Sequence, residues 1–74
     1  MKTSIIKSEI TGTVWKIVSR VGDTVAENQE LLILESMKME IPALAMDAGT
    51  VREILVSEGE AVKEGQDLVI LERG

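Results

Sequence analysis

The chain has 74 residues, with eight Lys and Arg against thirteen Asp and Glu, and it contains no Cys and no His. This length predicts one small domain, 1–74, in which neither a disulfide nor a histidine-bound metal supplies stability. The net charge of −5 and the single aromatic residue, Trp15, argue against nucleic-acid binding, which needs clustered basic side chains.

Nothing in the sequence predicts a membrane segment. No apolar run approaches the roughly 20 residues that a membrane-spanning helix needs. The first seven residues lack the apolar core and the cleavage site of a signal peptide. We therefore expect a cytoplasmic protein without a membrane partner, which fits the missing cysteines, and we expect the domain to be monomeric in isolation.

The first half of the chain is predicted to form four short strands. They are expected at residues 4–7, 12–18, near Val25 and at 31–34. The stretch 12–18 is rich in β-branched residues, and 31–34 is an apolar run too short for a helix. Between the strands, Gly22 and Asn28 mark tight turns, because both residue types enter the left-handed region at low cost.

The second half repeats the first. Further strands are predicted at residues 40–44, 50–56, near Val62 and at 68–71, and Pro42 indicates that the first of these is an edge strand or contains a bulge. Residues 12–35 align with 49–72 without a gap, and twelve of the 24 aligned pairs are identical. A repeat of this quality predicts two like halves.

These elements predict an all-β fold of two small four-stranded antiparallel sheets related by a pseudo-two-fold axis. The repeat shift of 37 residues places Met1 on Lys38, so the mate of the Lys38 turn is the gap between the two termini. We therefore expect the termini at one end of the molecule and Lys38 at the other.

The turn around Lys38 has unfavourable local chemistry. A hairpin joining the strands on either side places Met37-Lys38 at its tip, although two-residue hairpin turns favour Asn-Gly or Gly-X because they need positive φ. The same register sets Glu35 opposite Glu40, and like charges in opposition disfavour strand pairing. Sites that break several local rules together are typically functional.

The sequence around this lysine resembles the attachment motif of biotinyl domains, whose core is Ala/Ser-Met-Lys-Met; the matching residues are Glu35-Ser36-Met37-Lys38-Met39-Glu40. The segments 12–14 and 49–51, both Gly-Thr-Val, are also similar to that family. The resemblance implies a flattened β barrel, the barrel-sandwich hybrid, with the lysine on an exposed hairpin. The short connection 16–22 leaves no room for the protruding thumb of some bacterial carriers.

The resemblance also implies the chemistry. A biotin protein ligase would join biotin, the expected cofactor, to Lys38, with Glu35, Ser36, Met37 and Met39 as the surrounding site residues. The biotinyl group would then take a carboxyl group from biotin carboxylase to carboxyltransferase. The chain itself is expected to be a non-catalytic carrier, with no catalytic residues and no metal, because it contains no nucleophile–base pair.

Two alternatives stay open. A lipoyl domain shares the fold and the hairpin but usually flanks its lysine with Asp and Ala, so Met37 and Met39 favour biotin over lipoate; a domain that accepts both groups is a variant of this alternative. The other alternative is an unmodified barrel-sandwich module that acts as a structural adaptor. Such adaptors separate the two halves by a helical hairpin, for which this chain has no room.

Overall fold

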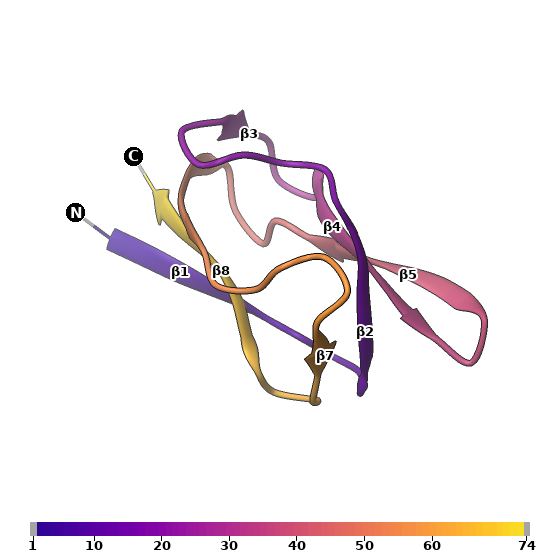
Figure 1. Cartoon of the computed structure of the whole chain (residues 1–74). Helices are drawn as coiled ribbons and strands as arrows, with labels where there is room; N and C mark the ends of the chain where they lie inside the picture. The colour runs from indigo at the N-terminus through magenta and orange to yellow at the C-terminus, as the bar shows by residue number, and fades with distance from the viewer. Residues whose placement is uncertain (1, 74) are drawn as a thin grey trace.

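The computed structural model describes residues 2–73 and contains eight strands in two four-stranded antiparallel sheets (Figure 1). The strands are β1 (Lys2–Lys7), β2 (Gly12–Ile17), β3 (Thr24–Val25), β4 (Glu30–Ser36), β5 (Met39–Leu44), β6 (Gly49–Ile54), β7 (Ala61–Val62) and β8 (Asp67–Arg73). The sheet orders are β1-β8-β6-β3 and β5-β4-β2-β7. The predicted all-β architecture is confirmed. Within residues 2–73 there is no helix with the length and apolarity that a membrane crossing requires.

The sequence repeat is also a structural repeat. Each strand from β5 to β8 has the bounds of its mate, β1 to β4, moved by 37 residues. The connections repeat as well: the Gly22 N–H donates to the Val51 carbonyl oxygen at 2.8 Å, and its mate Gly59 donates to the Val14 carbonyl oxygen at 2.7 Å. In each sheet two central strands come from one half and both edge strands from the other. Neither half can therefore complete a sheet by itself.

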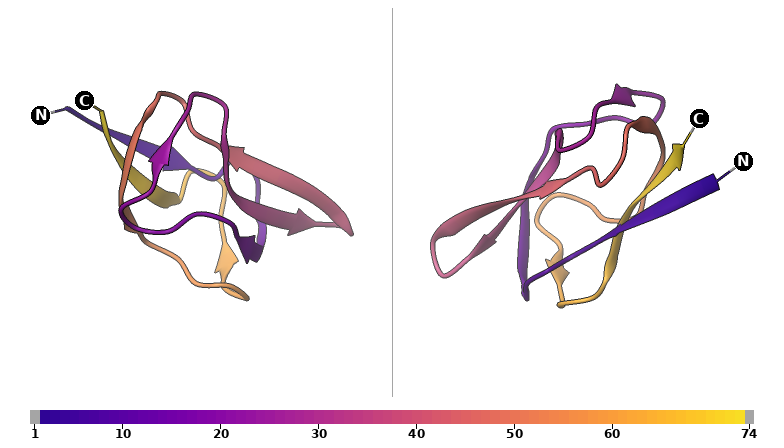
Figure 2. Two further views of the ribbon diagram at one scale, coloured as in Figure 1. Left: turned by 90° about the horizontal axis from the view of Figure 1, so that it is seen from above. Right: turned by 180° about the vertical axis from the view of Figure 1, so that it is seen from behind.

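The two ends of the described chain lie side by side. Lys2 of β1 pairs with Arg73 of β8, and this pair is the repeat mate of Met39 and Ser36 at the end of the β4–β5 hairpin. The hairpin projects from the opposite end of the molecule, as both views in Figure 2 show. The molecule measures 36 × 18 × 17 Å. The described chain ends, Lys2 and Arg73, thus lie opposite the Lys38 turn, as the repeat predicted, while Met1 and Gly74 themselves lie outside the described residues.

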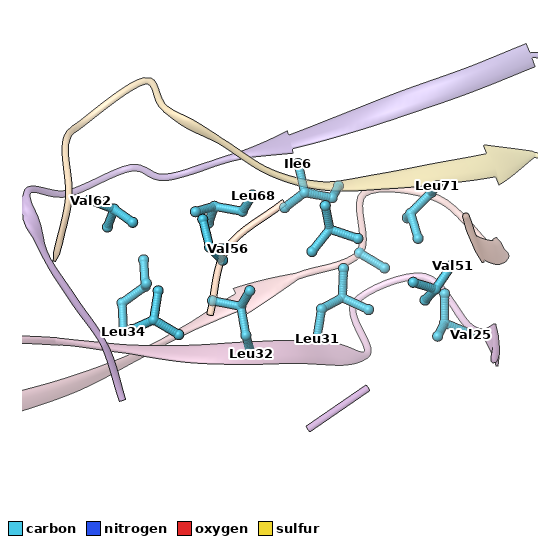
Figure 3. Packing of buried hydrophobic residues seen from close by; sticks show 13 residues of the cluster. Ile6, Val25, Leu31, Leu32, Leu34, Val51, Val56, Val62, Leu68 and Leu71 are labelled. Atoms are coloured by element: carbon cyan, nitrogen blue, oxygen red, sulfur yellow. The ribbon is translucent and has the colours of Figure 1, made fainter. Parts of the chain in front are cut away.

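The core is built from aliphatic side chains between the two sheets (Figure 3). Its buried members are Ile6, Val14, Val25, Leu31, Leu32, Leu34, Ala45, Val51, Val56, Val62, Leu68, Val69 and Leu71. In the described part of the chain two serines, Ser8 and Ser19, are also buried, and both hydroxyls are hydrogen-bonded. The Ser19 hydroxyl donates to the Leu31 carbonyl oxygen at 3.0 Å, and the Ser8 hydroxyl to the Ile10 carbonyl oxygen at 2.6 Å. Their polar groups therefore carry no large desolvation penalty.

The two longest predicted strands are shorter than expected. We expected strands at 12–18 and 50–56, whereas β2 ends at Ile17 and β6 at Ile54. Each strand contains a register shift, between Val14 and Lys16 in β2 and at the equivalent place in β6. Such bulges bend a strand and increase its twist. The chain leaves the ladder soon afterwards to enter the next turn.

The turn and edge predictions hold. Asn28 and its mate Gly65 both have positive φ, at 70° and 86°. Pro42 lies on β5, which is an edge strand of its sheet. A residue without an N–H group is tolerated there because the outer side of the strand has no ladder partner.

The close approach of β2 to the end of β4 requires a glycine. A Cβ atom at Gly12 would lie 2.5 Å from the carbonyl oxygen of Glu35, and one at Gly49 would lie 2.5 Å from that of Glu72. Both obstacles are backbone atoms, so the strands themselves must move. We predict that Gly12→Ala and Gly49→Ala each lower the free energy of unfolding by at least about 2 kcal/mol, because strand displacement opens the core.

Urea denaturation measures both effects, with the wild type as reference. The two losses should agree within about 0.5 kcal/mol, since the sites are repeat mates with the same backbone obstacle. A large loss at one site with none at the other would contradict the proposed equivalence of the two halves.

Candidate functional site

The Lys38 turn adopts the backbone conformation that its sequence disfavours. Met37 has φ 51° and Lys38 has φ 66°, and the turn consists of these two residues between Ser36 of β4 and Met39 of β5. Positive φ at both central positions defines the hairpin turn that prefers Asn-Gly. A left-handed conformation costs a residue with a Cβ roughly 1–2 kcal/mol. The turn therefore keeps two residues in a strained backbone conformation at its tip.

The hairpin brings together all the residues singled out from the sequence. Glu35 pairs with Glu40, and Ser36 pairs with Met39, on either side of the turn. The side chains of Met37 and Met39 are 93% and 61% exposed, and Lys38 is exposed as well. Ser36 is half-buried. The expected opposition of two glutamates is confirmed, whereas a role of these neighbours toward a cofactor stays a prediction.

Among residues 2–73, side chains close four other turns by a hydrogen bond, but none closes the Lys38 turn. The acceptors are Asp23, Gln29, Glu60 and Gln66, each of which receives the N–H of the residue three positions earlier at 2.9–3.1 Å. In residues 2–73, no side chain donates to or accepts from the backbone of the Lys38 turn, and neither ion pair involves Lys38. Its amine is therefore presented to solvent.

One supporting residue was not singled out as part of the site. Gly12 lies beneath the base of the hairpin, where its Cα hydrogen faces the Glu35 carbonyl oxygen; a Cβ there would also come within 3.4 Å of the Ser36 Cβ. It lets β2 pass close under the last residues of β4. The sequence could have indicated this role, because glycine occupies both repeat-related positions, Gly12 and Gly49.

Chemically, the site offers a primary amine on a protruding hairpin. Such an amine accepts an acyl group when another protein supplies an activated carboxyl. Within residues 2–73, no group of three His, Cys, Asp or Glu side chains is placed to hold a metal ion.

The fold and the site together define a carrier domain. A family model described as "Biotin-requiring enzyme", the biotin/lipoyl attachment family, matches residues 1–71, and the chain belongs to this family. The resemblance found in the sequence is thereby confirmed at the level of the family.

Relatives with similar sequences include an attachment protein and a carrier protein. The chain is 43% identical to a biotin/lipoyl attachment protein of Bacillus subtilis over 44 residues, which is 60% of each chain. It is 58% identical to a biotin carboxyl carrier protein of Streptococcus mutans over 38 residues, which covers 51% of this chain and 29% of that protein. The chain therefore spans less than two thirds of the length of these relatives.

Solved structures give the same fold over nearly the whole chain. The urea carboxylase of Kluyveromyces lactis matches with a TM-score of 0.92 and 33% identity, covering 97% of this chain and 6% of the carboxylase. A single-chain, multi-domain long-chain acyl-CoA carboxylase matches with a TM-score of 0.90 and 28% identity, covering 97% of this chain and 7% of that chain. In both cases the similar domain is a small part of a large carboxylase.

The strain in the turn leads to a prediction about stability. We predict that Met37→Asn combined with Lys38→Gly raises the free energy of unfolding by about 1–2 kcal/mol, because both new residues accept positive φ at lower cost. Urea denaturation of the variant and of the wild type measures the gain.

A reverse variant provides the control. Asn28 has a similar φ of 70° and an exposed side chain, so Asn28→Met should lower the stability by about 1 kcal/mol. An Asn-Gly hairpin that is no more stable than the native Met-Lys hairpin would show that the turn carries no strain.

Proposed function

We propose that the chain is a biotin carboxyl carrier and that biotin is attached to Lys38. A biotin protein ligase would form an amide between the Nζ atom of Lys38 and the carboxyl group of biotin. The carrier would then take a carboxyl group from biotin carboxylase to carboxyltransferase. The observation that carries this proposal is an exposed lysine at a positive-φ hairpin tip, between two exposed methionines, in a member of the biotin/lipoyl attachment family.

The geometry suits a carrier. For the amide to form, the neutral amine attacks the activated carboxyl carbon, the activating group leaves and the amine loses a proton. This reaction needs access to Lys38 from outside, which the uncapped, protruding turn provides. Once attached, the cofactor stays tethered, and a tether on this scale keeps a ligand at about millimolar concentration near each active site that it visits.

Lipoate is the second candidate group. The Bacillus subtilis relative carries both biotin and lipoyl in its name, which supports lipoate as an alternative group. Two observations favour biotin: the Met-Lys-Met sequence of the hairpin, and the names of several relatives, which include biotinylated proteins of mycobacteria. We therefore propose biotin as the cofactor and lipoate as the less favoured group.

The proposal predicts a single modified residue. Coexpression with a biotin protein ligase and excess biotin should raise the mass of the intact chain by one biotinyl group, with full conversion. Lys38→Arg should abolish the increase, because the guanidinium is not acylated under these conditions. Intact-mass spectrometry measures both results.

Lys63→Arg is the matched control, since Lys63 is also exposed and precedes a tight turn. The Lys63→Arg variant should be biotinylated as fully as the wild type. A biotin adduct that persists in the Lys38→Arg variant would contradict the proposed site. If a lipoate ligase modifies the chain and a biotin protein ligase does not, lipoate becomes the favoured group.

The methionines are predicted to contribute to recognition by the ligase. We expect Met37→Leu with Met39→Leu to leave the stability within about 0.5 kcal/mol, because both side chains are exposed. The kcat/KM of biotinylation should fall about 5–10-fold, equivalent to about 1–1.4 kcal/mol, through loss of the flexible thioethers at the contact.

Met46→Leu is the control, because Met46 is 63% exposed, close to the 61% of Met39, but lies outside the hairpin. Its biotinylation rate should equal that of the wild type. Equal rates in the double variant as well would remove the methionines from the proposed recognition surface.

A further inference from the structure

A groove of about 280 Å³ lies beside the base of the Lys38 hairpin. It is formed where the edge strand β5 faces the end of β1 and the loop that follows it, so it lies at the seam between the two sheets. Its apolar lining includes Ile10, Ile41, Leu44 and Met46. Neither the scaffold nor the hairpin turn explains why apolar side chains remain open to solvent here.

The near end of the groove is within reach of a group attached to Lys38. Ile41 lines the groove and lies three residues from Lys38, a distance of about 10 Å along a strand. The side chain of lysine and the valeryl chain of biotin together contain about eleven bonds, so the extended arm is on the order of 14 Å long. The arm can therefore fold back along β5 and place its ring system in the groove.

Resting on the function proposed above, we infer that this groove is a resting site for the ring system of the biotinyl group on Lys38. The sulfur-containing ring and its methylene chain are apolar and would contact Ile10, Ile41 and, with the arm fully extended, Leu44. The ureido ring carries two N–H donors and one carbonyl acceptor. Glu9 and Asn28 also line the groove, and they offer a carboxylate acceptor and an amide of both kinds.

Weak affinity is sufficient for such a site. A tether on this scale holds the ring system at about millimolar concentration near the groove. A groove with an intrinsic Kd of about 1 mM is then occupied about half of the time. A small open groove is expected to bind at this level, and partial occupancy leaves the arm free to reach the carboxylase sites.

The first test compares amide spectra of the unmodified and the biotinylated chain by NMR. We expect shift changes at Glu9, Ile10 and residues 41–44, in addition to residues 36–40 of the hairpin. The unmodified chain is also titrated with biocytin, the free amide of biotin and lysine, which should perturb the same groove residues at millimolar concentration. The titration needs no ligase, so it tests the groove even if Lys38 is not a ligase substrate.

Matched variants on two edge strands sharpen the test. Leu44 lines the groove and is 39% exposed, whereas Ile5 on β1 is 42% exposed and lies outside the lining. Leu44→Glu should remove the groove shifts, and Ile5→Glu should keep them. Streptavidin should bind the biotinylated Leu44→Glu variant about twofold faster than the biotinylated wild type or Ile5→Glu, because half of the wild-type ring systems are sheltered.

Shift changes confined to residues 36–40 in the biotinylated chain, together with no groove shifts up to 10-fold above about 1 mM biocytin, would overturn the resting site. Equal streptavidin rates in the two glutamate variants would also overturn it. Failure of the ligase to modify the chain would instead contradict the proposed function, and the biocytin titration would still decide the groove.

Discussion

The exchange of edge strands between the two halves is the constraint on which the rest of the structure depends. The pair β4-β2 of the first half is flanked by β5 and β7 of the second, and β8-β6 is flanked by β1 and β3. Without these borrowed strands, each central pair would expose two edges and one face of apolar side chains, which a two-stranded ribbon cannot stabilise in water. The chain lacks cysteine, so the interlocked sheets and the aliphatic core between them provide what disulfides provide in other domains of this size.

Because of this arrangement, the fold does not depend on the conformation of the Lys38 turn. The mate of the Lys38 turn is the gap between the two chain ends, where Lys2 and Arg73 already pair without any covalent link. Pairing at this position therefore does not depend on a well-formed turn. Strained residues at Met37 and Lys38 can be tolerated there, whereas the turns within each half carry glycine or asparagine at positive φ and side-chain acceptors that close them. The backbone strain thus lies in the Lys38 turn, whose conformation the fold does not require. Strained backbone of this kind is typical of functional sites.

Most of the fold could be predicted because the repeat supplied a second copy of every element. Asn28 was predicted at a tight turn, which its positive φ confirms, and Pro42 correctly indicated an edge. The bulges were missed, although Val14 and Ile17 both face the core at a spacing of three, which a regular strand cannot achieve. The hairpin tip was predicted from its unfavourable residues. The groove was not predicted, because it depends on how the loop after β1 packs against β5. No local sequence pattern determines the packing of these two distant segments.

Comparison of repeat mates separates structural differences from functional ones. Ser19 stands where the second half has Val56, but its hydroxyl is satisfied by the Leu31 carbonyl, so this difference stays inside the scaffold. Leu44 stands where the first half has Lys7, whose amine is bonded to Asp67 at 2.6 Å. An ion pair with Asp67 of β8 thus occupies the Lys7 position, whereas Leu44 leaves an apolar side chain open beside the groove. A scaffold that needed only solubility would favour the charged residue at both positions. The apolar residue, Leu44, lies on β5, the strand that follows Lys38 directly, where a tethered apolar ring would contact it.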